Sequence, residues 1–319
     1  MALPAVLRNL RLPVIGSPMY IVSGPELVAA QCKAGIVGAF PALNARPADQ
    51  LDVWLTRLKG ELADYQAEHP NSVVGPFAVN HVMHPSNDRF ERDIEVCVKH
   101  EVPLVLSSLS APPPVLLDSI HDYGGVVFHD VTNIRHARKA ADAGVDGLIL
   151  VAAGAGGHGG TLSPFALLSE VRAFFDGTIV LAGGIATGEA ILAAQTLGAD
   201  LAYIGSRFLA AREANTDDDY RRTVIDSTAA DIVYTDLFTG VPGNYLRKSI
   251  VDAGFDPDNL SPSTGDRMAF GEKDPLVMPW RDILGSGQGI GLVREVTSVR
   301  EIVDRWLAEY TATWERMAF

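Results

Sequence analysis

The chain has 319 residues, of which 47% are hydrophobic and 20% charged, so it can bury a large core and is not a disordered protein. Lys and Arg number 26 against 39 Asp and Glu, which gives a formal net charge of −13. This acidic balance argues against non-specific binding to nucleic acid or to an anionic membrane surface.

The two cysteines, Cys32 and Cys97, lie in helix-like segments without the spacing of a metal site. We therefore expect reduced core thiols and no metal. No apolar run reaches the length that a bilayer requires, and the N-terminus lacks a signal-peptide pattern. These features predict a cytoplasmic enzyme.

Short apolar runs alternate with helix-like segments along the first two thirds of the chain. The expected strands are residues 12–19, 35–40, 73–80, 103–107, 125–129, 145–151, 179–182 and 201–205. Helices are expected between them, and alternation of this kind favours parallel strands with crossover helices. Because no GxGxxG follows the first strand, we predict a closed (β/α)₈ barrel, or TIM barrel, rather than an open doubly wound sheet.

From about residue 215 the pattern changes. An acidic helix start and a helix over 220–230 precede a turn-rich loop at 238–245 and a polar segment at 254–273, which we expect to be an exposed loop or lid. A helix over 298–317 ends the chain. The predicted division is a barrel, residues 1–214, and a helical and loop-rich cap packed on it, residues 215–319.

A glycine-rich stretch at residues 151–160 (VAAGAGGHGG) follows the sixth expected strand. Its five glycines allow the backbone to approach a ligand closely, and one imidazole, His158, projects from it. In a barrel this loop lies at the C-terminal face, where active sites form. We predict that His158 accepts a proton there, because its ordinary pKa suits that role.

Two later apolar runs also end in glycine, at Gly183-Gly184 and at Gly205-Ser206. In a (β/α)₈ barrel the loops after strands seven and eight form the usual phosphate site. A phosphate is therefore expected at these four residues.

The other strand ends carry mainly amides, hydroxyls and imidazoles. The candidates are Pro18, Met19, Asn80, His81, Ser107, Ser108, His129 and Asp130. This set suits hydrogen bonding to a heteroaromatic ring and a ribityl chain better than metal binding or paired-carboxylate hydrolysis. Asp130 is interpreted as a cap of the following helix, because Thr132 and Asn133 lie beside it. The alternative is a supporting role in the site.

With these residues in place, the chain resembles the nitronate monooxygenases, formerly called 2-nitropropane dioxygenases. This family of FMN-dependent TIM barrels is related to flavin-type enoyl-ACP reductases and NADH:quinone reductases. The resemblance covers nearly the whole chain. It rests on residues 17–19 (SPM), 155–158 (AGGH), 181–185 (LAGGI) and 197–200 (LGAD) leading to 205–208 (GSRF).

The resemblance implies that FMN binds with its phosphate at the two later glycine turns and that His158 faces the substrate. The expected cofactor-binding residues are Pro18, Met19, Asn80, Ser107, His129, Gly156, Gly157, Gly183, Gly184, Gly205 and Ser206. In the family the histidine takes a proton from a neutral nitroalkane or orients the nitronate. Electron transfer to flavin and reaction with O₂ then give a carbonyl compound and nitrite.

Two departures from the family pattern concern polar groups near the flavin. The usual Gln-Gly-x-Glu is replaced by residues 151–154 (VAAG), and a lysine from strand five has no clear counterpart, with His129 as the candidate substitute. Two alternatives therefore stay open, an NAD(P)H-dependent FMN reductase of quinones or enoyl thioesters and a non-catalytic flavin-binding module. The expected partners are the small substrate and O₂, and the sequence leaves open whether a homo-oligomer forms.

Overall fold

The fold is described from a computed structural model, which describes residues 3–263 and 278–317. Eight parallel strands form its central sheet, in the order β1-β9-β8-β6-β5-β4-β3-β2. They are β1 (Val14–Gly16), β2 (Gly38–Pro41), β3 (Phe77–Met83), β4 (Leu104–Leu109), β5 (Val126–Val131), β6 (Gly147–Val151), β8 (Thr178–Ala182) and β9 (Leu201–Ile204). β1 is shorter than the strand expected at 12–19, because Pro13 and Pro18 on either side carry no N–H for the ladder.

The sheet closes into a barrel where β1 meets the start of β2, the two strands at the ends of this order. Ile15 and Val37 form a parallel bridge, in which the Gly16 N–H donates to the Val37 carbonyl at 2.8 Å and the Val37 N–H donates to the Val14 carbonyl at 3.0 Å. The prediction of a (β/α)₈ barrel is therefore confirmed.

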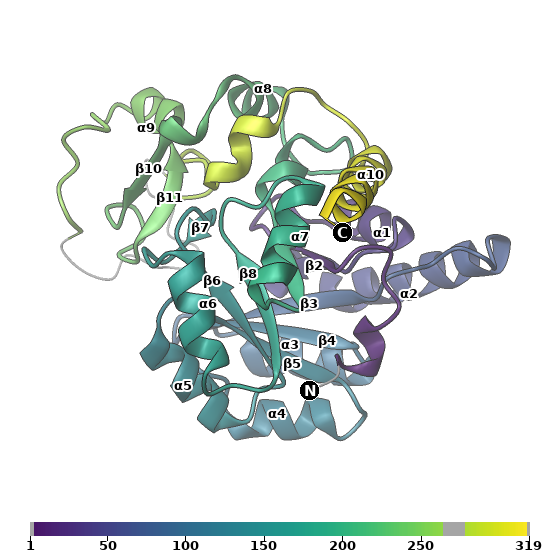
Figure 1. Cartoon of the computed structure of the whole chain (residues 1–319). Helices are drawn as coiled ribbons and strands as arrows, with labels where there is room; N and C mark the ends of the chain where they lie inside the picture. The colour runs from purple at the N-terminus through teal and green to yellow at the C-terminus, as the bar shows by residue number, and fades with distance from the viewer. Residues whose placement is uncertain (1–2, 264–277, 318–319) are drawn as a thin grey trace.

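Seven helices connect successive barrel strands and cover the outside of the sheet (Figure 1). They are α1 (Pro25–Lys33), α2 (Gln50–Glu68), α3 (Phe90–Lys99), α4 (Pro114–His121), α5 (Ile134–Ala143), α6 (Pro164–Arg172) and α7 (Gly188–Leu197). α5 and α7 begin at side-chain caps, Asn133 and Thr187. No helix among the described residues is long and apolar enough to cross a membrane.

Side chains alternate along each strand between the barrel interior and the surrounding helices. The interior cluster draws apolar residues from all eight strands and none from the seven connecting helices, with Leu104, Leu106, Phe128 and Ile149 among them. The residues between them on the same strands, such as Val105, pack with the helices. Near the C-terminal end of a strand this alternation decides which side chains face a ligand.

The C-terminal part contains both helices and strands. Its elements are α8 (Asp218–Asp226), β10 (Ile232–Thr235), β11 (Gly243–Leu246), α9 (Arg247–Asp252) and α10 (Val299–Met317). β10, β11 and β7 (Gly157–His158) form an antiparallel three-stranded sheet. The C-terminal part thus adds two strands to the helices and loops expected there, because residues 243–246 form a strand once they pair with the glycine-rich stretch.

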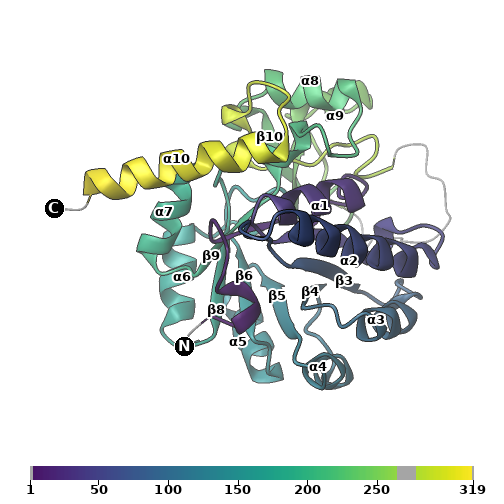
Figure 2. The same ribbon diagram turned by 90° about the vertical axis from the view of Figure 1, so that its right-hand side faces the viewer.

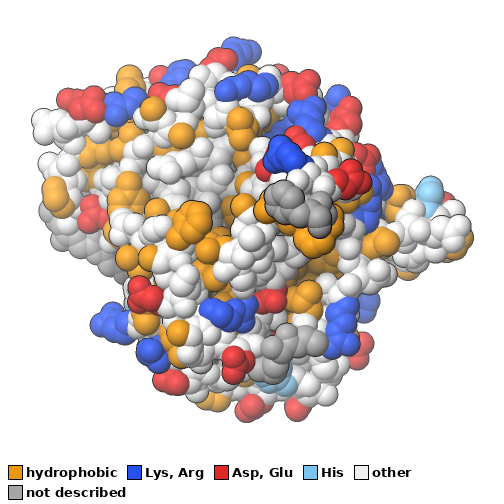
Figure 3. Space-filling view, viewed as in Figure 1, with side chains coloured by type: hydrophobic (Ala, Val, Ile, Leu, Met, Phe, Trp, Pro, Cys, Tyr) orange, Lys and Arg blue, Asp and Glu red, His pale blue; other side chains and the backbone are white. Residues whose placement is uncertain are grey.

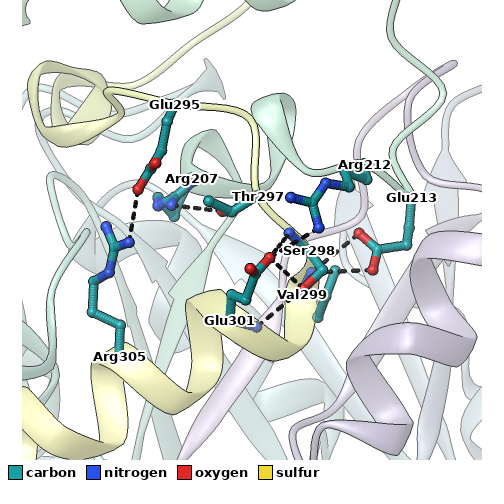
Figure 4. Close-up of polar contacts among 9 residues, drawn as sticks. All are labelled: Arg207, Arg212, Glu213, Glu295, Thr297, Ser298, Val299, Glu301 and Arg305. Carbon is teal, nitrogen blue, oxygen red and sulfur yellow. Dashed lines mark hydrogen bonds and ion pairs between the residues drawn. The ribbon is translucent and has the colours of Figure 1, made fainter.

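α10 runs across α7 and α1 and extends past the barrel (Figure 2). Its first turn is held by a capping box, in which the Ser298 N–H donates to Glu301 Oε2 at 2.7 Å and the Glu301 N–H donates to Ser298 Oγ at 3.3 Å. Figure 4 shows the adjoining bond from buried Arg207 to Thr297 Oγ1, at 3.1 Å. This bond joins the segment just before α10 to the turn after β9, and the boundary at residue 214 stays a prediction.

The surface carries acidic and basic side chains interspersed with apolar ones, as the face in Figure 3 shows. Part of the segment that we expected to be a lid, residues 254–273, falls outside the described residues, which resume at 278. Its described part, up to residue 263, is mostly exposed.

Candidate functional site

A cavity of about 730 Å³ lies at the C-terminal ends of the barrel strands and is bounded on its other side by the C-terminal part. Strand ends contribute Asn80, Ser108 and Tyr203, and the opposite wall includes Trp280. Ligand pockets measure roughly 300–1,000 Å³, so this cavity has room for a cofactor-sized molecule.

The two later glycine turns lie side by side on this cavity, after β8 and β9. Gly183 and Gly184 have φ values of +129° and +68°, which favour glycine. A Cβ on Gly183 would lie 2.6 Å from the Ala153 carbonyl oxygen, whereas a Cβ on Gly184 would meet no atom within 4 Å. Gly184 therefore borders open space, where a ligand can approach its backbone.

The glycine-rich stretch is held by the C-terminal part through β7. Gly157 pairs with Asn244 and His158 pairs with Gly243, and the Asn244 side chain donates to the Ala155 carbonyl at 2.6 Å. A Cβ on Gly156 would lie 2.8 Å from the Gly287 nitrogen. Gly156 is thus required for the close approach of two backbone segments.

His158 is half-buried and contacts two residues of the C-terminal part. Its Nε2 lies 3.0 Å from Thr239 Oγ1, and its ring meets the Trp280 ring edge-on with centroids 5.2 Å apart. The Thr239 hydroxyl donates its proton to the Val241 carbonyl at 2.9 Å, so we assign Nε2 of His158 as the donor in its own bond to Thr239. In this tautomer Nδ1 carries the lone pair.

Burial lowers the pKa of His158 to about 4. The imidazole is therefore neutral near pH 7 and can accept a proton at Nδ1. A positive charge on the ring becomes favourable only beside an anion.

The cavity floor holds a chain of polar side chains from adjacent strands. Asn80 Nδ2 donates to Ser108 Oγ at 2.7 Å, and Ser108 Oγ donates to Asp130 Oδ2 at 3.0 Å. Tyr203 borders the same cavity from β9. Two buried oxygen atoms here, Asp130 Oδ1 and the Tyr203 hydroxyl, have no hydrogen-bond partner among the described residues.

Two of the expected cofactor-binding residues face the wrong way for that role. Ser107 Oγ lies 2.8 Å from His129 Nδ1, and both side chains are buried away from the cavity lining. Ser108 and Asp130 are the next residues along β4 and β5, so strand alternation turns them toward the cavity instead.

The interpretation of Asp130 as a helix cap was also wrong. α5 is capped by Asn133, which accepts from the His136 N–H at 2.9 Å. The Asp130 side chain borders the cavity and bonds to Ser108.

The structure brings the other predicted site residues together around the one cavity. These are Pro18, Met19, Asn80, Gly156, Gly157, His158, Gly183, Gly184, Gly205 and Ser206. Sequence reasoning missed Tyr203, Thr239 and Trp280. Strand alternation could have pointed to Tyr203, but Thr239 and Trp280 lie in loop-rich segments with no motif to mark them.

The chain matches the nitronate monooxygenase family over residues 5–309. A provisionally named monooxygenase of Mycobacterium tuberculosis is 34% identical over 64% of this chain, which spans only 51% of that protein. A nitronate monooxygenase of Paraburkholderia phytofirmans is 27% identical over 79% of this chain and 78% of its own length. A (3aS,4S,5R,7aS)-5-hydroxy-7a-methyl-1-oxo-octahydro-1H-indene-4-carboxyl-CoA dehydrogenase of Rhodococcus jostii is 26% identical over 93% of this chain and 92% of its own length.

Among solved structures, a nitroalkane oxidase from Streptomyces ansochromogenes superposes with a TM-score of 0.83 at 24% identity. The match covers 98% of this chain and 100% of that chain, and at this identity it shows a shared fold. The family match extends over the barrel strands, both glycine turns, the His158 loop and most of α10. The resemblance seen in the motifs is thereby confirmed, and the chain belongs to the nitronate monooxygenase family.

Proposed function

We propose that this protein uses bound FMN to oxidise alkyl nitronates with O₂ to a carbonyl compound and nitrite. The observation that carries the proposal is the position of His158, which borders the same cavity as the glycine turns after β8 and β9. Family membership supports the same reaction class.

The residues around the cavity fit FMN. Gly184 borders open space and can present its backbone to a phosphate, with Gly205 and Ser206 beside it. At the floor, Asn80 and Ser108 offer polar atoms to a ring and ribityl chain, and the unpartnered oxygen of Asp130 is available to a ligand. FMN, when bound, would supply a two-electron acceptor that also reacts with O₂.

His158 has the form of a proton acceptor, because its Nε2 is bonded to Thr239 and its ring is neutral near pH 7. Proton transfer from the α-carbon of a nitroalkane to Nδ1 would leave an imidazolium beside the new nitronate. Attraction between these charges offsets the low pKa of the buried ring. A substrate supplied as the nitronate does not need this proton transfer.

The described wall of the cavity offers no Lys or Arg to a negatively charged substituent of the substrate. It carries apolar and aromatic side chains. The apolar and aromatic members include Tyr20, Val22, Leu43, Leu109, Leu162, Tyr234, Val241 and Trp280. We therefore expect nitronates with an uncharged alkyl group to be better substrates than propionate 3-nitronate.

The experiment is oxygen uptake by FMN-loaded protein, with nitrite measured in parallel and no NAD(P)H present. Propyl-2-nitronate and propionate 3-nitronate are compared at equal concentrations. We expect oxygen uptake with nitrite release, faster for the uncharged alkyl compound. No uptake with either substrate would contradict the proposal.

A second candidate is an NAD(P)H-dependent flavin enzyme acting on thioesters, which the relationship to the carboxyl-CoA dehydrogenase of R. jostii favours. Its signature in the same preparation is flavin bleaching on addition of NADH or NADPH, with no oxygen uptake on nitronates.

A further inference from the structure

Asp130 is the one acidic residue among the described residues that line the cavity. Its Oδ2 accepts from Ser108 at 3.0 Å, and Ser108 in turn accepts from Asn80 at 2.7 Å, so the carboxyl group is held in place from the adjacent strand. Its Oδ1 is buried without a partner among the described residues. A buried carboxylate oxygen with no donor is costly, so this group calls for either a proton or a ligand.

The groups that face Asp130 across the cavity offer no positive charge. The other titratable residues of the described lining are Tyr203 from β9, His136 from α5, His158 from β7, and Tyr20, Tyr220 and Tyr234. Burial lowers the pKa of both histidines, so both are neutral near pH 7. The pKa of Tyr203 is raised by burial and by the Asp130 charge, so this tyrosine also keeps its proton.

The negative charge of an ionised Asp130 would therefore have no positive charge beside it in the described lining. It would also share the cavity with the phosphate of a nucleotide-like ligand. The neutral carboxyl avoids that repulsion and gains an O–H donor. Burial raises the pKa of Asp130 to about 7, with Ser108 opposing the shift, so the neutral form is accessible near physiological pH. An anionic ligand raises this pKa further.

We propose that Asp130, in its neutral form, donates a hydrogen bond to an acceptor atom of the heteroaromatic ring bound on the cavity floor. It is a binding residue for that ring, placed at the end of β5 where His129 had been expected. Because it rests on the FMN binding proposed above, its test measures FMN binding directly and does not depend on turnover.

The donor must be lost when the carboxyl ionises, so FMN affinity is coupled to one proton. Above the pKa of Asp130, the dissociation constant of FMN is expected to rise by about tenfold per pH unit. The measurement is made between pH 7 and pH 9, above the second pKa of the phosphate, which is about 6. Ionisation of the phosphate therefore does not account for a change in affinity over this range.

The experiment is a fluorescence titration of FMN with flavin-free protein at pH 7, 8 and 9. We expect the affinity of the wild type for FMN to fall between pH 7 and pH 9. The affinity of Asp130→Asn should stay constant, because its amide donates a hydrogen bond at every pH. Asp122→Asn removes an exposed carboxylate at the end of α4 and is the matched control, which keeps the wild-type pH dependence. Ser108→Ala removes the donor that lowers the pKa of Asp130. The affinity of this variant for FMN should therefore begin to fall at a higher pH than that of the wild type.

The outcomes separate the two proposals. FMN binding with the same pH dependence in the wild type and in Asp130→Asn overturns the role of Asp130 and leaves the proposed function intact. No FMN binding by the wild type at any pH overturns both. The assignment is supported if the affinity for FMN does not change with pH in Asp130→Asn but falls with rising pH in the Asp122→Asn control.

Discussion

Gly184→Ala tests whether the turn after β8 holds a phosphate. Gly184 has a φ of +68° and a Cβ there would meet no atom within 4 Å, so the substitution costs conformational strain without a clash. For an L-residue this left-handed conformation costs roughly 1–2 kcal/mol. Gly144→Ala is the matched control, because Gly144 has a φ of +94°, also borders open space and ends α5 outside the cavity lining.

The two variants should therefore lose similar amounts of unfolding free energy but differ in FMN binding. A methyl group on Gly184 enters the cavity where the phosphate would meet the backbone. Losing one hydrogen bond to a charged group costs about 1.5–3 kcal/mol, or roughly 10- to 150-fold in affinity. Gly144→Ala should bind FMN as the wild type does.

The measurements are urea unfolding, to compare the stabilities, and FMN titration by fluorescence. Equal FMN affinity in the two variants would show that the phosphate lies elsewhere. A much larger loss of stability in Gly184→Ala than in Gly144→Ala would refute the claim that the space at Gly184 is open.

Two further predictions concern His158 and His129. His158→Ala should keep the flavin-to-protein absorbance ratio but slow turnover, most of all with neutral nitroalkanes; equal rates for variant and wild type on both substrate forms would remove His158 from the mechanism. Burial lowers the pKa of His129 to about 4, from an ordinary value of 6.5. As the pH falls, His129 therefore takes up a proton in the unfolded chain before it does so in the folded protein. The folded state loses stability between pH 6.5 and pH 4. The stability advantage of the wild type over His129→Asn should therefore shrink by about 3 kcal/mol across that window in urea unfolding, and a constant difference would contradict the assignment.

The barrel and its glycine turns could be predicted because their signals are local. Each strand is a short apolar run beside a helix-like segment, and α1 occupies residues 25–33, between Gly24 and Gly35. The glycine turns are marked by residue type, since only glycine adopts positive φ without strain. Their convergence on one cavity follows from the parallel arrangement of the strands.

The face of a strand on which a side chain lies was harder to predict. Ser107 and His129 lie one residue before Ser108 and Asp130, and an error of one position moves a side chain from the cavity to the helix layer. Apolar residues occupy both faces of these strands, so their hydrophobic pattern shows no alternation. Closure of the barrel decides which face is the interior.

The sequence alone determined the fold class, the glycine turns and the position of His158 in a loop at the barrel mouth. Only the tertiary structure decided what holds that histidine, because β7 is a two-residue strand that exists through pairing with β11. Thr239 lies 81 positions from His158 along the chain and Trp280 still further, so no local pattern connects them. Local propensity acts over a few residues, whereas the environment that lowers the pKa of His158 is assembled by packing between distant segments.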